Sequence, residues 1–478
     1  MKNFIYKSLL LAICSTAVIA CKPTLELTVV NPGTADFTRF VSIGDGTPGG
    51  YSDASLNREA QLVAFPNLLA EQFKLVGMHG DFAQPLILPY VSTVNGHTYT
   101  GIGFENGKVG TQYDLQYRTL CGGKPELHPE MIDSSILKSN DLLAVLNFKV
   151  EPPPAGGYYN NLAAQGVKLI YMNMKPNWFH APKTSSTSST YWTKISSTLG
   201  TTGPLASTML QDAMVQKPTF VSINAGGTDV LRFAKSGGDQ DNGDDDMITP
   251  LSEFHDSLYS LMNTLTAKNA GKVKGVIVNI IGLSSFPYFN YIKYNGLVLT
   301  STQADELNTL YAGQLTFHVG TNNYVIDDQS ATNSCKCRQI KDDEYVLIEI
   351  QDSLRWCYGI GSKVPLRKRW VLDETEINTV TTNIIAFNSE LKTAALTYNF
   401  AYVDGYNSIQ QVVKGTQYEG ITLTSEMVNG NQFSLDGLDI GAFGQATTAN
   451  SCIDAINKKY GSTIPGIDAT KFSGVIFH

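Results

Sequence analysis

Short apolar runs alternate with amphipathic stretches along most of the chain. The runs at 40–43, 219–224, 275–280 and 400–404 are rich in β-branched or aromatic residues, which is typical of buried strands. Apolar residues at the helical spacing lie between these runs. Strands that alternate with helices form a parallel sheet covered on both faces, so the pattern predicts an α/β fold.

The starts of two helices are also marked in the sequence. Thr249 and Pro250 precede one helix, and Asp373 and Glu376 form a capping-box-like pair at the start of another. The apolar faces of these helices combine Leu251, Phe254, Leu258, Leu261, Met262 and Leu265 in the first and Ile377, Val380, Ile384, Phe387 and Leu391 in the second. A shorter helical face combines Phe65, Leu68, Leu69 and Phe73.

Long irregular segments interrupt the alternation. They lie near 80–160, 184–218 and 290–370, and most are rich in Tyr, Asn, Gly, Ser or Thr. Loops of this length inside a compact domain are usually functional or mobile. We expect these segments to be insertions that cover one edge or mouth of the sheet.

The first twenty residues have the pattern of a bacterial lipoprotein signal. Lys2 and Lys7 precede a short apolar core, and "VIAC" is a small-residue cleavage site that ends in Cys21. The apolar stretch is too short to cross a bilayer. We expect removal of residues 1–20 and attachment of the Cys21 thiol to lipid, with 21–36 as a tether to a body at 37–478.

The chain is acidic, with 35 Lys and Arg against 43 Asp and Glu. Because the signal holds two lysines and no acid, the formal charge falls from −8 to −10 when it is removed. This balance argues against nucleic acid as a partner, and against binding to anionic lipid surfaces.

Five cysteines remain after the signal and Cys21 are set aside: Cys121, Cys335, Cys337, Cys357 and Cys452. An odd number leaves at least one thiol unpaired, and spacing alone does not assign partners. Cys335, Cys337 and Cys357 with His318 fit no standard zinc spacing, so one disulfide with buried thiols is favoured.

The familiar catalytic and binding motifs are absent from the sequence. It contains no G-x-S-x-G, no H-E-x-x-H and no phosphate-binding G-x-x-x-x-G-K-[ST]. The acidic run at 239–246 lacks a turn glycine in the register of a calcium loop and a bidentate acid at the twelfth position, so a solvated loop is the better interpretation. We expect neither a metal ion nor a cofactor.

Several blocks, in their order along the chain, resemble the SGNH/GDSL hydrolases, and more closely a lipoprotein branch of that family found in Bacteroidota. The blocks are "RFVSIGDGTPGGYSD", "FPNLLAEQF", "YYNNLAAQGVK", "FVSINAGGTDVLRFAKSGG", "MITPLSEF", "FPYFNYIKYNGL", "KRWVLDETEINTVTTNIIAFNSELK" and "FSLDGLDIGAFGQATTANSCIDAINKKYGSTIPGID". The resemblance implies a three-layer αβα fold with a doubly wound parallel sheet, of the SGNH-hydrolase or flavodoxin-like kind, and attachment to the outer membrane.

The same resemblance places this chain's residues on the family's catalytic pattern. Gly46 stands where the family has its nucleophilic serine, and Gly166 keeps the place of an oxyanion-binding glycine. Thr228 replaces an asparagine of the oxyanion hole. In the last block Asp436 is kept, but Asp439 replaces the catalytic histidine.

Physical chemistry also argues against ester hydrolysis by this chain. Acyl transfer by serine needs a hydroxyl, a neutral imidazole and oxyanion donors, and no histidine lies between His318 and His478. Aspartate is a weak base, and Asp45, Asp436 and Asp439 are expected to repel one another. Loss of the nucleophile or base alone costs a triad hydrolase about a factor of a million.

The first hypothesis is therefore a catalytically inert, lipid-anchored envelope protein. It would be a binding or structural subunit of an outer-membrane protein complex, contacted through the Tyr- and Asn-rich insertions. The sequence does not fix which face of the outer membrane the body occupies.

Two alternatives stay open. The former catalytic pocket could bind a sugar or a cation through Asp45, Thr47, Thr228, Asp229, Asp436 and Asp439, although an Asp after a strand is more often a hydrogen-bonded loop residue. The other alternative is an active esterase or acylhydrolase on acylated glycans or lipids, with a non-standard nucleophile such as Thr47.

Overall fold

The computed structural model describes residues 29–88, 92–94, 97–99, 101–103, 112–119, 125–132, 148–154, 157–173, 191–192, 194–197, 207–238, 246–267, 272–354 and 358–474. The predicted signal and Cys21 lie outside the described residues, as do Cys121, Cys357 and most of the acidic run at 239–246. In the described part of the chain, no helix is long and apolar enough to cross a membrane.

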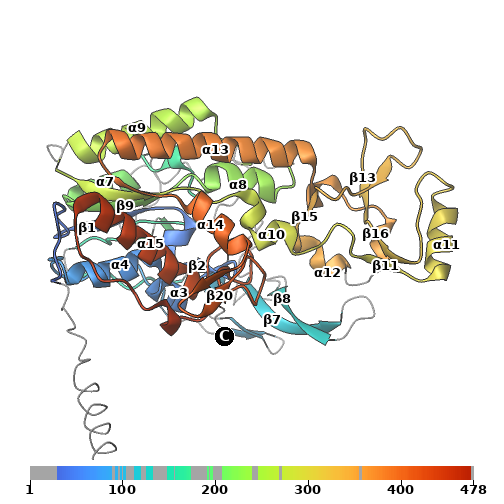
Figure 1. Cartoon of the computed structure of the whole chain (residues 1–478), viewed down its shortest axis with the longest axis horizontal. Coiled ribbons are helices and arrows are strands. Elements are labelled where there is room, and N and C mark those ends of the chain that lie inside the picture. Colours follow the sequence, from blue (N-terminus) through green and yellow to red (C-terminus); the bar gives the residue numbers. More distant parts are fainter. Residues whose placement is uncertain are drawn as a thin grey trace, which may run out of the picture.

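A parallel sheet of four strands forms the centre of the molecule (Figure 1). Its strands, in spatial order, are β1 (Phe40–Gly44), β9 (Phe220–Asn224), β10 (Lys274–Val278) and β18 (Ala401–Val403). Every neighbouring pair runs parallel. The expected α/β fold with a central parallel sheet is confirmed.

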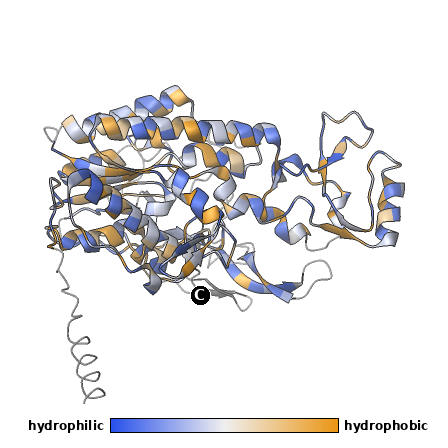
Figure 2. Cartoon of the chain, in the orientation of Figure 1, coloured by the Kyte–Doolittle hydropathy of each residue, from blue (hydrophilic) through white to orange (hydrophobic). Residues whose placement is uncertain are grey.

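Helices cover both faces of this sheet (Figure 1). On one face the strand residues, such as Val41 and Ile223, pack against α9 (Leu251–Ala267) and α13 (Glu374–Thr397). The alternate residues, among them Phe40, Phe220 and Val276, pack against α4 (Phe65–Lys74) and α15 (Ala442–Tyr460) on the other face. Successive side chains of a strand point to opposite faces, so two apolar layers result. Figure 2 shows hydrophobic and hydrophilic residues alternating along α9 and α13, as expected of helices with one buried face.

Residues 160–164 extend the sheet beyond β1. The amide of Ser42 donates to the carbonyl of Asn160 at 2.9 Å, and the amide of Leu162 donates to the carbonyl of Ser42 at 2.9 Å. Ser42 and Asn161 form a parallel bridge. β1 therefore has a hydrogen-bonded neighbour on each side.

The two helices with marked starts are confirmed. At the start of α13, the Asp373 carboxylate accepts from the amide of Glu376 at 3.0 Å, and the Glu376 carboxylate accepts from the amide of Asp373 at 2.9 Å. Phe254 of α9 stacks on Phe387 of α13 with 4.1 Å between ring centres. The prediction that Leu251 lies on the buried face is wrong: it is 43% exposed, because α9 begins at this residue, one turn before Phe254.

The described part of the predicted tether packs against the body. The amide of Thr34 donates to the carbonyl of Tyr460 at 2.9 Å, and the amide of Thr463 donates to the carbonyl of Asn31 at 2.9 Å. Ala35 is buried beside them. Residues 29–36 thus fix the entry of the chain at the end of α15.

Residues 292–371 form a lobe with its own hydrophobic cluster, to the right in Figure 1. Its elements are β11 (Leu297–Leu299), α11 (Ser301–Leu310), β12 (Gly320–Asn322), β13 (Val325–Asp327), β14 (Cys337–Gln339), β15 (Tyr345–Val346), α12 (Gln351–Leu354), β16 (Gly359–Val364) and β17 (Val371–Leu372). Cys335 and Cys337 form a disulfide, whereas Cys452 in α15 is a buried thiol.

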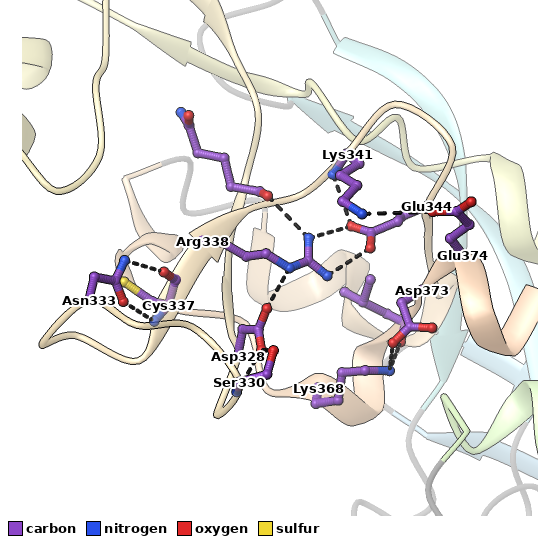
Figure 3. A network of polar contacts seen from close by, with 12 residues as sticks. Asp328, Ser330, Asn333, Cys337, Arg338, Lys341, Glu344, Lys368, Asp373 and Glu374 are labelled. Carbon is purple, nitrogen blue, oxygen red and sulfur yellow. Dashed lines mark hydrogen bonds and ion pairs between the residues drawn. The ribbon is translucent and has the colours of Figure 1, made fainter.

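A charged network links two turns of the lobe (Figure 3). The Arg338 guanidinium donates to both oxygens of Glu344, at 2.6 and 2.7 Å, and to Asp328 at 2.8 Å. The side chain of Glu344 is only 1% exposed, and its Oε2 also accepts from the amide of Lys341 at 2.9 Å. The buried carboxylate is therefore held by bidentate charge-assisted hydrogen bonds.

Candidate functional site

The residues singled out in the sequence lie at the carboxyl edge of the sheet, where parallel α/β folds usually carry their sites. β1 ends at Gly44 and is followed by α2 (Gly46–Gly49), and β9 ends at Asn224. The amide of Asp45 donates to the carbonyl of Asn224 at 3.1 Å. A Cβ on Gly44 would lie 2.3 Å from that same carbonyl oxygen, so only glycine fits there.

Asp45 is buried between the ends of β1 and β9. Its Oδ2 accepts long hydrogen bonds from the amide of Thr228 at 3.4 Å and from the Thr228 hydroxyl at 3.5 Å, at the start of α8 (Thr228–Lys235). Burial raises the pKa of Asp45 to about 7, and the negative charge of Asp229 adds to the rise. Asp45 therefore holds a proton well above the usual range of a carboxyl.

The space in front of Gly46 is filled by an amide. A Cβ on Gly46 would lie 1.5 Å from Oε1 of Gln165 and 2.7 Å from its Cδ. Gln165 follows the edge segment 160–164, and Gly166 after it has a φ of +75°. A side chain at position 46 cannot coexist with Gln165 in this rotamer, and no motif in the sequence indicated that obstruction.

Thr47 is held through its backbone. Its carbonyl accepts from Nε2 of Gln445 at 3.0 Å, and Oε1 of Gln445 accepts from the amide of Phe65 at 2.9 Å. Two histidines make their side-chain contacts with other residues: His128 forms a hydrogen bond with Tyr291, and His255 with Glu390. Neither of these two imidazoles is paired with the Thr47 hydroxyl.

Asp229 is a fully buried structural group. Its Oδ2 accepts from the amide of Leu169 at 2.8 Å, and its Oδ1 accepts from the Thr249 hydroxyl at 2.7 Å. Burial raises its pKa, while these hydrogen bonds and the charge of Lys168 oppose the rise. Asp229 lies in the first turn of α8 and not in a loop, and its contacts fit the hydrogen-bonded structural interpretation of this acid.

Asp436 joins its own loop to a hairpin at the other side of the edge. Its Oδ1 accepts from the amides of Leu438 and Asp439, both at 2.8 Å, and its Oδ2 accepts from the amide of Ala54 at 2.6 Å. The hairpin consists of β2 (Tyr51–Ser52) and β3 (Ser55–Asn57). Asp436 also fits a structural role in the loop.

The sequence did not single out Asp53, which lies at the tip of this hairpin. Its Oδ1 accepts from the amide of Leu435 at 2.7 Å, and its amide donates to the Ser434 hydroxyl at 3.0 Å. Asp53 and Ala54 have φ values of +56° and +57°, as a two-residue type I′ turn requires. Burial and then the charge of Asp53 raise the pKa of Asp436.

Asp439 is buried in the same turn as Asp436, and its carbonyl accepts from the amide of Ser434 at 2.8 Å. The sequence predicted repulsion among Asp45, Asp436 and Asp439. The acid that raises the pKa of Asp45 is Asp229, and the acid that raises the pKa of Asp436 is Asp53. At Asp45 and Asp436, acids of other elements thus add to the rise in pKa that burial causes.

Among the described residues, no group of three or more His, Cys, Asp or Glu side chains is arranged to hold a metal ion. No family model, curated protein or solved structure matches the chain. The fold and site define an α/β protein with a parallel sheet, whose carboxyl edge carries buried, hydrogen-bonded acids and no side chain at Gly46.

Proposed function

We propose that this protein is a catalytically inert, SGNH-hydrolase-like lipoprotein of the outer membrane, anchored through Cys21 and acting as a binding or structural subunit of a protein complex. The main support for the proposed loss of catalysis is the position of Gln165, whose amide fills the space in front of Gly46. A nucleophile and its substrate carbonyl would have to occupy that space.

The order of the strands supports the proposed doubly wound, SGNH-like fold. If residues 160–164 are counted as the second strand, the spatial order of the five segments in chain numbering is 2-1-3-4-5. This is the order of flavodoxin-like folds, which change direction between their first and third strands. Asp45 and Thr228 follow those two strands, as functional residues of such folds commonly do.

The proposed binding role draws on the surfaces that project from the sheet. Several large apolar residues of the lobe are exposed: Val298, Leu310, Val319, Ile360 and Val364. The hairpin of β7 (Gln112–Thr119) and β8 (Pro125–Ile132) also pairs Tyr117 with Leu127, which are 70% and 41% exposed. Exposed aromatic and aliphatic residues on projecting elements suit contacts with a protein partner.

Ester hydrolysis tests the inert site directly. The mature chain should not turn over short-chain p-nitrophenyl esters, and it should not react covalently with a fluorophosphonate probe. The restoration variant Gly46→Ser/Gln165→Ala/Thr228→Asn/Asp439→His should gain measurable turnover if the scaffold is aligned as proposed. Turnover or labelling of the natural chain would contradict the proposal and would direct attention to Thr47.

The subunit role needs its own test. The natural protein is extracted from outer membranes with mild detergent. It should migrate in native electrophoresis as a complex larger than the monomer. Cys21→Ala should release the protein from the membrane fraction. Migration as a free monomer at every detergent concentration would contradict a role in a complex. This result would not test the proposed lipid anchor at Cys21.

A further inference from the structure

The edge of the sheet opposite the candidate site gathers six segments of the chain: 29–39, 74–81, 215–219, 272–274, 396–400 and 457–465. We call it the basic edge. The parallel strands all begin here, and α4 and α15 end here. Hydrogen bonds join the segments: Nε of Arg39 donates to the carbonyl of Lys217 at 2.6 Å, and the amide of Lys274 to the carbonyl of Thr219 at 3.1 Å.

The charge of this edge is opposite to that of the chain as a whole. Its basic residues are Arg39, Lys74, Lys217, Lys272, Lys274, Lys458 and Lys459, and Asp36 and Asp81 are acidic in the same segments. Lys74 forms ion pairs with Asp81 at 3.8 Å and with Glu71, one turn earlier in α4, at 2.8 Å, so the other six basic residues supply the positive charge. The opposite edge holds buried acids, and burial raises the pKa values of Asp45, Asp229 and Asp436. The positive charge of the basic edge therefore contrasts with the negative net charge of the whole chain.

Exposed apolar side chains lie among these basic residues. Val29 is 80% exposed, Leu75 57%, Val215 51% and Leu396 71%. Leu75 directly follows Lys74, and Val215 lies two residues before Lys217. A surface that mixes exposed aliphatic residues with lysines suits the boundary between lipid head groups and acyl chains.

The chain enters the body at this same edge. The Thr463 hydroxyl donates to the carbonyl of Val29 at 2.6 Å, which fixes the first described residue beside the end of α15. In Figure 1 this start lies at the opposite end of the molecule from the lobe. An extended residue spans at most about 3.6 Å, so Val29 lies within roughly 29 Å of Cys21.

We propose that the basic edge lies against the bilayer and binds anionic lipid head groups. This inference rests on the proposed acylation of Cys21, which holds the edge within reach of the membrane. Asp45 is separated from Arg39 by the five residues of β1, roughly 16 Å of strand, and burial raises the pKa of Asp45. The acids of the far edge therefore do little to weaken the attraction, and the lobe faces away from the lipid.

Vesicle binding tests this edge without the anchor. The chain from residue 22 onward is sedimented with vesicles of phosphatidylglycerol and phosphatidylcholine, and with phosphatidylcholine alone. We expect salt-sensitive binding to the anionic vesicles only. Because each lysine near an anionic surface contributes roughly a fivefold change in partitioning, Lys217→Gln/Lys458→Gln/Lys459→Gln should weaken binding roughly a hundredfold.

The matched control is Lys293→Gln/Lys341→Gln/Lys363→Gln, which removes the same charge from the lobe. It should bind like the natural chain. Lys458 and Lys459 also lie in the last turn of α15, where they complement the helix dipole, so both variants are first shown to unfold at the same denaturant concentration as the natural chain. Equal losses in the two variants, or equal binding to both kinds of vesicle, would overturn the inference.

Lysine acetylation of the acylated protein gives the second test. On anionic vesicles Lys217, Lys272 and Lys458 should react several-fold more slowly than in detergent, while Lys341 and Lys363 react equally in both. Equal rates at Lys217 and Lys458 would overturn the inference although the anchor stands. If Cys21 carries no lipid in cells, the proposed anchoring fails, and the sedimentation experiment still decides whether the basic edge binds lipid.

Discussion

At the scale of single residues, the contact between Gly46 and Gln165 is the main support for the proposed loss of catalysis. Gly46→Ala puts a methyl group onto Oε1 of Gln165, which must change rotamer. Because the obstacle is the far end of a flexible side chain, we expect a loss of about 1–2 kcal/mol in the free energy of unfolding. Urea denaturation measures this loss.

A double-mutant cycle identifies the cause of that loss. In a Gln165→Ala background, Gly46→Ala should cost a few tenths of a kcal/mol, because the obstructing amide is gone. The same cost in both backgrounds would show that the backbone of Gly46, and not Gln165, resists the side chain. The turnover proposed for the restoration variant would then need more than the removal of Gln165.

Asp45 makes a residue-scale prediction about pH. With a folded pKa of about 7 against an ordinary value of 3.8, the folded chain keeps a proton that the unfolded chain releases between these values, so stability falls as pH rises through this window. Asp45→Asn removes the free-energy cost of ionising this buried carboxyl. Its stability relative to the natural chain should therefore improve by roughly 2 kcal/mol between pH 5 and pH 8.

Chemical denaturation at the two pH values measures this change. The comparison with the natural chain removes the contribution of other buried acids, such as Asp229 and Asp436, which titrate in both proteins. A difference between variant and natural chain that is the same at pH 5 and pH 8 would mean that Asp45 ionises in the ordinary range.

At the scale of elements, the cap of α13 should contribute measurably to stability. Asp373→Ala removes the acceptor for the amide of Glu376, and the usual cost of losing such a cap is about 1 kcal/mol. Asp373→Ser keeps an acceptor at the same place and should be close to neutral. Equal losses in the two variants would assign the effect to the charge of Asp373 near Lys368 and not to the cap.

This cap was predictable from sequence because its two partners are three residues apart. The four strands were predictable for a similar reason, since each is a continuous run of β-branched or aromatic residues. The edge segment 160–164 was not, because "NNLAA" has no strand-like pattern and is held by hydrogen bonds to a strand more than a hundred residues earlier. Local patterns predict elements, whereas pairing between distant segments depends on the complete fold.

The candidate site could also be predicted from sequence only where local patterns were sufficient. Sequence blocks identified Asp45, Thr228, Asp436 and Asp439, but the groups that determine their chemistry come from other elements. Gln165 follows the edge segment, and the Leu169 amide and the Thr249 hydroxyl hold Asp229 from two different loops. Asp53 acts on Asp436 from the tip of a hairpin. The two residues at this tip, Asp53 and Ala54, have positive φ values although neither is a glycine. No spacing rule connects these positions.

At the scale of the whole molecule, the lobe and the central sheet have separate hydrophobic clusters. The Arg338 network lies inside the lobe, so its loss should loosen the lobe and spare the sheet (Figure 3). Arg338→Met leaves the Glu344 carboxylate buried without its bidentate partner. Because Arg338 and Asp328 are partly exposed to solvent, we expect a local cost of about 2 kcal/mol, below that of a fully buried pair.

Hydrogen exchange followed by mass spectrometry locates this cost. Amides of β13, β14 and β15 should exchange faster in Arg338→Met, while those of β1 and β9 keep their protection, because local opening of one cluster need not open the other. Arg338→Met/Glu344→Gln also removes the unpaired negative charge of Glu344 and should recover most of the protection against exchange in the lobe. Faster exchange in β1 and β9 as well would mean that lobe and sheet unfold as one unit. The lobe could then not change its conformation independently of the sheet.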